Sequence, residues 1–267
     1  MIVSLLTDYG HEDEFVGVLH GVIRRIAPDV PIVDLTHGIL RHDIREGAIV
    51  LRNSLPYLPA GVHVAVVDPQ VGTERRAVAV RTADERILVG PDNGLLSFAW
   101  ERLGGAVEAV DVSRSPFRLE PVSATFHGRD VFAPVGARLA TGAQLLEAGD
   151  PLDPAELVAP SLPEPRVGTD DAIAHAILVD RYGNVSLDMG HAELLRLDLT
   201  IGSPVRVEVR GEAAEARVVQ TFADVPEGEL LLYEDAWGSL ALAVNRGDAA
   251  AELGLDADDE VRLTRSP

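Results

Sequence analysis

The sequence predicts an α/β protein of two domains, with a mainly parallel α/β sandwich over residues 1–160 and a smaller antiparallel β domain over residues 172–267. In the N-terminal part, apolar runs of strand length alternate with segments of helical periodicity, which is typical of βαβ units. The C-terminal part holds only short alternating segments separated by turn residues, which favours a β sandwich or barrel. Between them, residues 159–171 contain three prolines and a glycine, as an interdomain linker would.

The N-terminal elements follow from hydrophobic periodicity. Apolar side chains recur at helical spacing in two segments, which predicts two helices with one buried face each. These stripes are Phe15, Val18 or Leu19, Val22 and Ile26, and then Ile44, Ala48, Leu51 and Leu55. In chain order, the expected elements are a strand at 2–8, a helix at 15–28, a strand at 31–36, a helix at 43–58 and a strand at 62–68.

Further along, the Asp92-Asn93-Gly94 turn is expected to lead into a helix over 95–103, and a helix capped by Asp130 is expected to start at Val131. In the C-terminal part, a turn at 181–184 separates the first two of seven short strands. These strands are expected at 172–180, 185–187, 204–211, 216–222, 229–235, 239–245 and 261–265.

The composition excludes several classes of protein. The 267 residues include no cysteine, so disulfides, thiolate nucleophiles and Cys-ligated zinc are ruled out. A net charge of −20 disfavours binding to nucleic acid and favours a cationic small molecule, although the acidity also serves solubility. No apolar run of membrane-spanning length and no secretory signal is found, so we expect no membrane partner and a cytoplasmic location.

Three of the predicted strands end at an aspartate or just beyond one, and these acids are Asp8, Asp34 and Asp68. The carboxyl ends of strands in an open α/β sheet form the usual ligand crevice, so three acids there indicate a site, although a single acid often caps a turn. Two apolar runs within residues 66–80 are separated by a charged turn that holds Arg75.

The segment His127-Gly128 is a second candidate, because a glycine beside the imidazole leaves room for a ligand. A metal site is the obvious rival, since His37, His42 and Asp43 follow one of these strands. However, the sequence has no His pair at helical spacing and no HExxH motif, so we expect no metal. Phosphate-binding glycine motifs are absent as well, which disfavours the usual modes of nucleotide binding.

Distinctive motifs occur along nearly the whole chain. They are TDYG (7–10), FVGVLHGVI (15–23), DLTHGI (34–39), DIREGA (43–48), VVDPQVGTERRAVAV (66–80), GPDNGLLS (90–97), TFHGRDVFAP (125–134), DRYGN (180–184) and YEDAWGSLALAVNRGDAA (233–250). Taken together, these motifs resemble the S-adenosyl-L-methionine hydrolases, also called hydroxide adenosyltransferases, which are related to the fluorinases and chlorinases.

The resemblance implies a catalytic triad of Asp68, Arg75 and His127. It also implies a homotrimer whose active sites lie between the N-terminal domain of one subunit and the C-terminal domain of the next. S-adenosyl-L-methionine would be the substrate, with no cofactor, and the products would be adenosine and L-methionine. The chemistry is reasonable, because a sulfonium leaves as a neutral thioether and needs only a water held in line at the ribose 5′ carbon.

Substrate contacts are also implied by the resemblance. Asp8 would accept both ribose hydroxyls, and Phe126 would pack against the sugar or adenine. The C-terminal domain would contribute contacts to the adenine and to the methionine. These residues are Asp180 for the methionine ammonium, Asn184, Asn245 and Arg246 for the adenine, and Trp237 as a cover.

The sequence departs from the family pattern at Gln70, where glycine is usual, and at Ala236, where serine is usual. These departures bear on the position of Arg75 and on the methionine contacts. The halogenases differ at Asp68, His127 and Gly128, and a carboxylate near the nucleophile would repel a halide. A non-catalytic sensor of S-adenosyl-L-methionine or adenosine is the main alternative from another class of protein.

Overall fold

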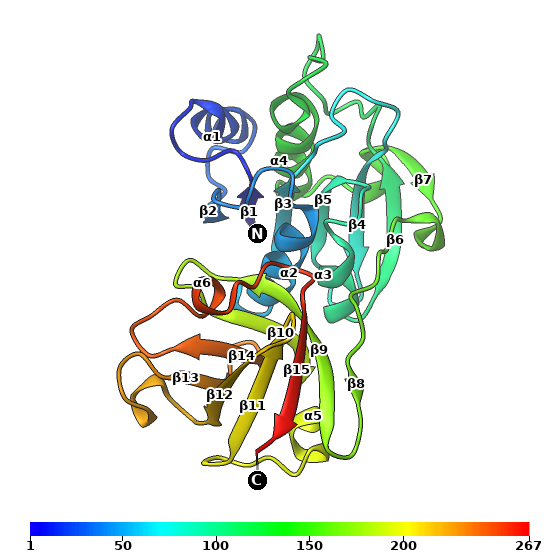
Figure 1. Ribbon diagram of the computed structural model, residues 1–267. Helices are drawn as coiled ribbons and strands as arrows, with labels where there is room; N and C mark the ends of the chain where they lie inside the picture. The colour runs from blue at the N-terminus through cyan, green and yellow to red at the C-terminus, as the bar shows by residue number, and fades with distance from the viewer. Residues whose placement is uncertain (267) are drawn as a thin grey trace. The chain divides into compact units, whose positions relative to one another are not determined.

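The computed structural model describes residues 1–266, and the chain divides into two compact units, residues 1–160 and the part that begins at Ser161 (Figure 1). Each unit has a hydrophobic core of its own. The first unit combines helices with mostly parallel strands, and the second is built mainly of antiparallel strands. The predicted fold class is therefore confirmed.

The sheet of the first unit has seven strands in the order β2-β1-β3-β5-β4-β6-β7. β1, β2, β3 and β5 run parallel, whereas β4 is antiparallel to both β5 and β6. Strand β7 is antiparallel to β6, so only β4 and β7 run against the others. The strands are β1 (Ile2–Thr7), β2 (Ile32–Thr36), β3 (Gly61–Val66), β4 (Ala77–Thr82), β5 (Ile87–Pro91), β6 (Ala106–Asp111) and β7 (Asp150–Leu152).

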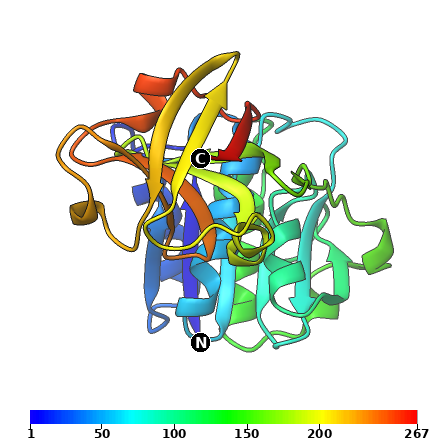
Figure 2. The ribbon, with the colours of Figure 1, turned by 60° about the horizontal axis from the view of Figure 1, so that its bottom comes forward.

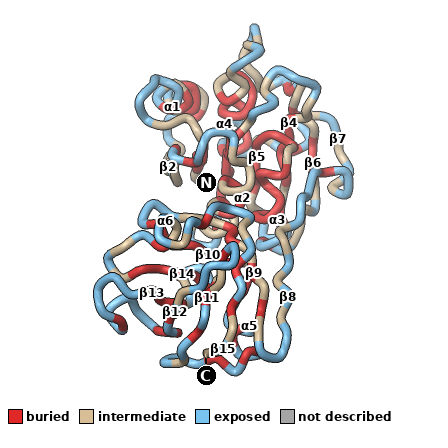
Figure 3. Tube along the Cα trace, viewed as in Figure 1, coloured by how far each residue is buried: buried red, intermediate tan, exposed pale blue. Residues whose placement is uncertain are grey.

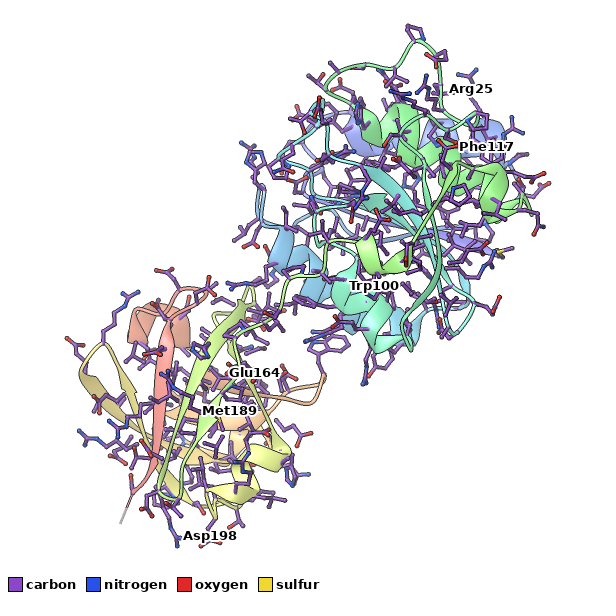
Figure 4. The ribbon with its side chains drawn as sticks, turned by 90° about the vertical axis from the view of Figure 1, so that its right-hand side faces the viewer. Arg25, Trp100, Phe117, Glu164, Met189 and Asp198 are labelled. Carbon is purple, nitrogen blue, oxygen red and sulfur yellow. The ribbon has the colours of Figure 1, made fainter. Side chains whose placement is uncertain are left out.

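Helices cover both faces of this sheet, because successive strand residues point to opposite sides. Helices α1 (Phe15–Ile26) and α4 (Ala133–Ala140) share a core with Val3 and Leu5 of β1. Helices α2 (Ile44–Ser54) and α3 (Ser97–Arg102) share the other core with Leu6. Trp100 of α3, labelled in Figure 4, packs in that second core. The central strands β1, β3, β4 and β5 are consequently buried on both sides, and Figure 3 shows buried segments in red.

Both predicted N-terminal helices are present and end slightly earlier than expected. The first ends at Ile26, shortly before Pro28, and the second at Ser54, where a short 3₁₀ turn that contains Pro56 follows. Proline has no backbone N–H to donate, so each helix stops close to it. The second helix starts where predicted, because the Asp43 carboxylate accepts a hydrogen bond of 2.8 Å from the Glu46 backbone N–H.

The prediction that Asp130 caps a helix is wrong. The helical segment begins earlier, with a π-helical turn at Gly128–Phe132 that leads into α4. Asp130 lies inside this turn with 2% of its surface exposed. Its carboxylate accepts a hydrogen bond of 2.8 Å from the Ser123 N–H and pairs with Arg129 Nε at 2.7 Å, so it holds the preceding loop instead of a helix terminus.

The second unit contains an eight-stranded sheet in the order β10-β14-β13-β12-β11-β15-β9-β8. An additional pairing of β10 with β9 closes it into a barrel, whose β11–β12 hairpin is yellow in Figure 2. The buried Met189, labelled in Figure 4, belongs to its core. The strands are β8 (Arg166–Val167), β9 (Asp171–Val179), β10 (Val185–Gly190), β11 (Pro204–Val209), β12 (Glu212–Val218), β13 (Leu230–Glu234), β14 (Ser239–Val244) and β15 (Glu260–Arg265).

Three features of this unit were not predicted. Two short helices, α5 (His191–Arg196) and α6 (Ala249–Leu253), lie among the strands, and β8 lies inside the expected linker. Strands β12 and β13 pair in parallel, because the eleven residues between them form a long connection instead of a hairpin. None of the helices in residues 1–266 combines the length and the apolar character needed to cross a bilayer.

Candidate active site

The carboxyl edge of the first sheet brings the predicted N-terminal residues together. β1 and β3 are parallel neighbours, with Thr7 paired to Val66, so Asp8 and Asp68 follow adjacent strand ends. β4 runs the other way and starts at Ala77, opposite the end of β5. The chain therefore leaves β3 and enters β4 at the same edge, which places Arg75 beside Asp68.

A cavity of about 350 Å³ opens at this edge. Carboxylates, cations and aromatic rings all contribute to its wall. Its charged or titratable lining residues include Asp8, Asp13, Arg41, His42, Asp68 and His127, and its aromatic ones are Tyr9 and Phe15. Three carboxylates facing a small cavity give it a negative character that suits a cationic ligand.

Asp68, Arg75 and His127 are in direct contact. Arg75 Nε lies 2.9 and 3.0 Å from the two carboxylate oxygens of Asp68, and Arg75 Nη2 also contacts Asp68 Oδ2. The same Nη2 lies 3.1 Å from His127 Nδ1. The side chains of Asp68 and Arg75 are each only 5% exposed. Asp68 and His127 line the cavity and Arg75 does not, so the guanidinium joins the two lining groups and fixes their orientation.

The turn between Asp68 and Arg75 tolerates the unusual Gln70. Gln70 is not among the residues with positive φ, whereas Gly72 has a φ of +80°. A Cβ atom on Gly72 would lie 2.3 Å from the Ala124 carbonyl oxygen, so position 72 is the one in this turn that requires glycine. Arg75 still reaches Asp68 with glutamine at position 70.

The contact with Arg75 determines the tautomer of the His127 imidazole and favours its neutral state. A guanidinium offers donors only, so Nδ1 of His127 must be the acceptor and the ring proton of the neutral imidazole lies on Nε2. Burial, and then the positive charge of Arg75, lower the pKa of His127 below its usual 6.5, although Asp68 and Asp130 act in the opposite direction. The imidazole is therefore neutral near pH 7.

Asp8 has a structural contact in addition to its place on the cavity wall. Its Oδ2 accepts a hydrogen bond of 3.0 Å from the backbone N–H of His42, which has a φ of +67°. A positive φ is strained for a residue with a side chain, and this bond helps to hold it. As a result, Arg41 and His42 reach the cavity, which the sequence did not lead us to expect for Arg41.

An aromatic cluster borders the same cavity through Tyr9 and Phe15, whereas Phe126 packs behind them and does not line it. The ring of Tyr9 lies 5.7 Å from that of Phe15 and 5.9 Å from that of Phe126. Part of the space beside Gly128 is occupied by Tyr9, because a Cβ on Gly128 would lie 2.4 Å from the Tyr9 hydroxyl oxygen. Gly128 also lines the cavity together with His127, so the idea that it leaves room for a ligand stays a prediction.

The other strand-end acids serve as structural partners. Asp34 does not line the cavity, and its Oδ1 lies 2.9 Å from His20 Nε2 and 3.1 Å from His37 Nε2. His37 is 1% exposed, and its Nδ1 lies 2.8 Å from Thr7 Oγ1. Asp92 pairs with Arg76. Within residues 1–266, no group of three or more histidine, cysteine, aspartate or glutamate side chains is arranged to hold a metal ion.

The predicted residues of the second unit do not all lie together. Asp180 accepts hydrogen bonds from the Tyr182 N–H at 2.8 Å and the Asn184 N–H at 3.0 Å, and from the Asn184 side-chain amide at 2.7 Å. These bonds shape the turn between β9 and β10. The Ala250 N–H donates to the Gly183 carbonyl at 3.0 Å, which ties this turn to α6.

Asn245 and Arg246 follow β14, at the same barrel end as the Asp180–Asn184 turn, since β14 pairs with β10 in antiparallel. The Asn245 side-chain amide donates to the Val225 carbonyl at 2.8 Å. Arg246 Nη1 lies 2.7 Å from Glu227 Oε1. These contacts help to hold the backbone at Asn245 and Arg246, which the family resemblance assigned to adenine recognition.

Trp237 lies at the opposite end of β14, in the turn from β13, and is 46% exposed. Asp235 organises this turn, because its carboxylate accepts hydrogen bonds from the Trp237 N–H at 2.8 Å and from Ser186 Oγ at 2.9 Å. The turn that contains Ala236 is thus ordered without the usual serine. A single ligand that contacted both Trp237 and Asn245 would have to extend along the length of β14.

Comparisons with known proteins find similarity over nearly the whole chain. Residues 3–149 match the family described as SAM hydroxide adenosyltransferase N-terminal domain, and residues 174–262 match its C-terminal domain. An (R)-S-adenosyl-L-methionine hydrolase from Salinispora tropica is 46% identical over 262 residues, which cover 98% of this chain and 97% of that protein. A fluorinase from Nocardia brasiliensis is 29% identical over 289 residues, covering 98% and 96%. The crystal structure of an uncharacterized conserved protein from Thermotoga maritima has a TM-score of 0.92 and 36% identity, covering 99% of this chain and 100% of that one.

Proposed function

The chain belongs to the SAM hydroxide adenosyltransferase family, and we propose that it hydrolyses S-adenosyl-L-methionine to adenosine and L-methionine. The observation that carries the proposal is a guanidinium, Arg75, that contacts both Asp68 and His127 where these two line a cavity at the sheet edge. The name of the Salinispora tropica relative supports this substrate.

In the proposed reaction, a water oxygen attacks the ribose 5′ carbon from the side opposite the sulfur. The new C–O bond forms as the C–S bond breaks, and the electron pair of that bond goes to sulfur, which leaves as the neutral thioether of methionine. One proton is released from the water. Asp68 and His127 hold the water, and the charge of Arg75 stabilises the hydroxide character that develops on attack.

The negative cavity favours the cationic substrate over its neutral products. The carboxylates of Asp8, Asp13 and Asp68 attract the sulfonium before the reaction, and this attraction is lost once the sulfur is neutral. The same carboxylates repel a free halide, which supports water as the nucleophile. Asp8 is proposed to accept the two ribose hydroxyls, and Phe126 to pack against the nucleoside.

We further propose that the enzyme works without a metal ion or cofactor, in the cytoplasm, and as a homotrimer. In that assembly, a neighbouring subunit supplies Asp180, Asn184, Trp237, Asn245 and Arg246 to each site. Light scattering coupled to size-exclusion chromatography measures the subunit number, and a monomer that turns over at the full rate would contradict the shared site.

The experiment that tests the function is an incubation of purified protein with S-adenosyl-L-methionine in isotopically labelled water, with and without chelator. We expect adenosine that carries the label at its 5′ oxygen, together with methionine, at equal rates in both samples. Binding without product would favour the sensor, loss of activity with chelator would favour a metal hydrolase, and a 5′-halogenated product with added halide would favour a halogenase.

A further inference from the structure

Tyr9 lines the cavity from a rigid setting. Its ring makes edge or tilted contacts with Phe15 and Phe126, with interplanar angles of 54° and 72°. Its backbone N–H donates to Thr7 Oγ1 at 3.2 Å, and the next N–H, of Gly10, donates to the His37 carbonyl at 2.8 Å. Because both the ring and the backbone are held, the position of the hydroxyl is set by the fold.

The hydroxyl lies against Gly128, next to the catalytic candidate His127. A Cβ on Gly128 would be 2.4 Å from the Tyr9 oxygen and 3.3 Å from the ring carbon that bears it. Any larger residue at position 128 would therefore displace this hydroxyl. Because residue 128 is glycine, the hydroxyl of Tyr9, which follows the carboxyl end of β1, can reach the start of the helical turn next to His127.

No hydrogen bond to the Tyr9 hydroxyl is found among residues 1–266, although Tyr9, Asp68 and His127 line the same cavity. Tyr9 is half-buried and its oxygen is not among the buried side-chain atoms that lack a partner, so this oxygen reaches open space and can bond an occupant of the cavity. Burial, followed by the charges of Asp8 and Asp68, raises the pKa of Tyr9 above its usual 10. The phenol therefore keeps its proton and can both donate and accept.

We propose that the Tyr9 hydroxyl is a third group, with Asp68 and His127, that holds the attacking water. This inference rests on the proposed hydrolysis and adds a catalytic residue to it. Two contacts leave a water free to rotate about the line that joins them, whereas a third fixes the lone pair that must point at the 5′ carbon. Since the phenol is neutral, it adds this direction without a charge that would compete with the sulfonium.

The test is Tyr9→Phe, which removes one oxygen and keeps the ring between its aromatic neighbours. We expect kcat for adenosine release to fall about 10-fold, the order of magnitude for the loss of one hydrogen bond between neutral groups, with KM almost unchanged. Tyr57→Phe is the matched control, because Tyr57 is 72% exposed and does not line the cavity. It should leave both constants unchanged.

Gly128→Ala provides a second, independent variant. The added methyl group should displace the hydroxyl in the wild type and cost much less in the Tyr9→Phe background, where the clashing oxygen is absent. If the wild type is active and Tyr9→Phe has the same kcat, the proposed role of Tyr9 is overturned. A rise in the KM of Tyr9→Phe without a fall in its kcat would overturn this role as well. A wild type that releases no adenosine would instead overturn the hydrolase proposal, and this inference with it.

Discussion

Replacing Arg75 with lysine tests whether the guanidinium acts as a bridge or only as a positive charge. Arg75 reaches both oxygens of Asp68 through Nε and Nη2 and reaches His127 Nδ1 through Nη2. Lysine keeps the charge but has a single nitrogen on a flexible stem, so it cannot hold both partners in fixed directions. We expect it to keep Asp68 as its partner and to release His127.

The size of the effect follows from the contact that is lost. A hydrogen bond that involves a charged group contributes about 1.5–3 kcal/mol, and at 1.36 kcal/mol per decade this corresponds to a fall of about 10- to 100-fold in kcat. Stability should change less, because the buried carboxylate of Asp68 keeps a cation beside it. Arg75→Ala should be worse in both respects, since an unpaired buried carboxylate costs about 3–5 kcal/mol.

The assay is adenosine release under saturating S-adenosyl-L-methionine, with thermal melting of each variant as a check on folding. Arg81→Lys is the matched control, because Arg81 lies on β4 and pairs with Glu108 away from the cavity. If Arg75→Lys turned over at the wild-type rate, charge alone would suffice, and the bridging role would be refuted.

Three further outcomes are expected. Asp8→Asn, which keeps an oxygen for the His42 N–H, should weaken adenosine binding by about 10-fold in calorimetry for the loss of a charge-assisted hydrogen bond; unchanged affinity would remove Asp8 from the ribose site. Since burial and Arg75 lower the pKa of His127, kcat/KM should fall on acidification only below its usual 6.5; an acidic limb centred above 6.5 would argue against this assignment. Burial, and then Arg86, lower the pKa of His63 to about 4 from 6.5. The contribution of His63 to stability is therefore complete above pH 6.5 and is lost as the pH falls toward 4, by about 3 kcal/mol, and urea unfolding of His63→Gln should lack this slope.

The first unit could be predicted largely because its strands and helices have clear periodicity and end at polar residues. The direction of β4 could not be predicted, since a buried antiparallel strand such as Ala77–Thr82 has the same apolar composition as its parallel neighbours. Yet that reversal is what returns Arg75 to the edge where Asp68 lies. The sequence pointed to Asp68 and Arg75, and the topology supplies the reason that these two residues meet.

Tyr9 and Asp130 show why the rest could not be predicted. In the TDYG segment, a tyrosine next to strand β1 resembles an ordinary core residue, and nothing local relates its hydroxyl to Gly128. The only signal was the glycine after His127, which indicated a close approach without identifying the group. Asp130 was assigned as a cap from its local sequence, but the π-helical turn shifted the start of the helix toward the N-terminus.

The tautomer of His127 decides how the proton of the attacking water can move. With Nδ1 accepting from Arg75, the ring proton lies on Nε2, so a water held there receives a hydrogen bond and cannot give up its proton at the same atom. Asp68, by contrast, has lone pairs beyond those that Arg75 occupies, and it lines the cavity. In the proposed reaction, His127 therefore orients the water through Nε2–H, and the proton moves toward the carboxylate as the C–S bond breaks. Protonation of His127 would place a second ring N–H against the guanidinium and break the bridge, so the proposed reaction requires the neutral imidazole.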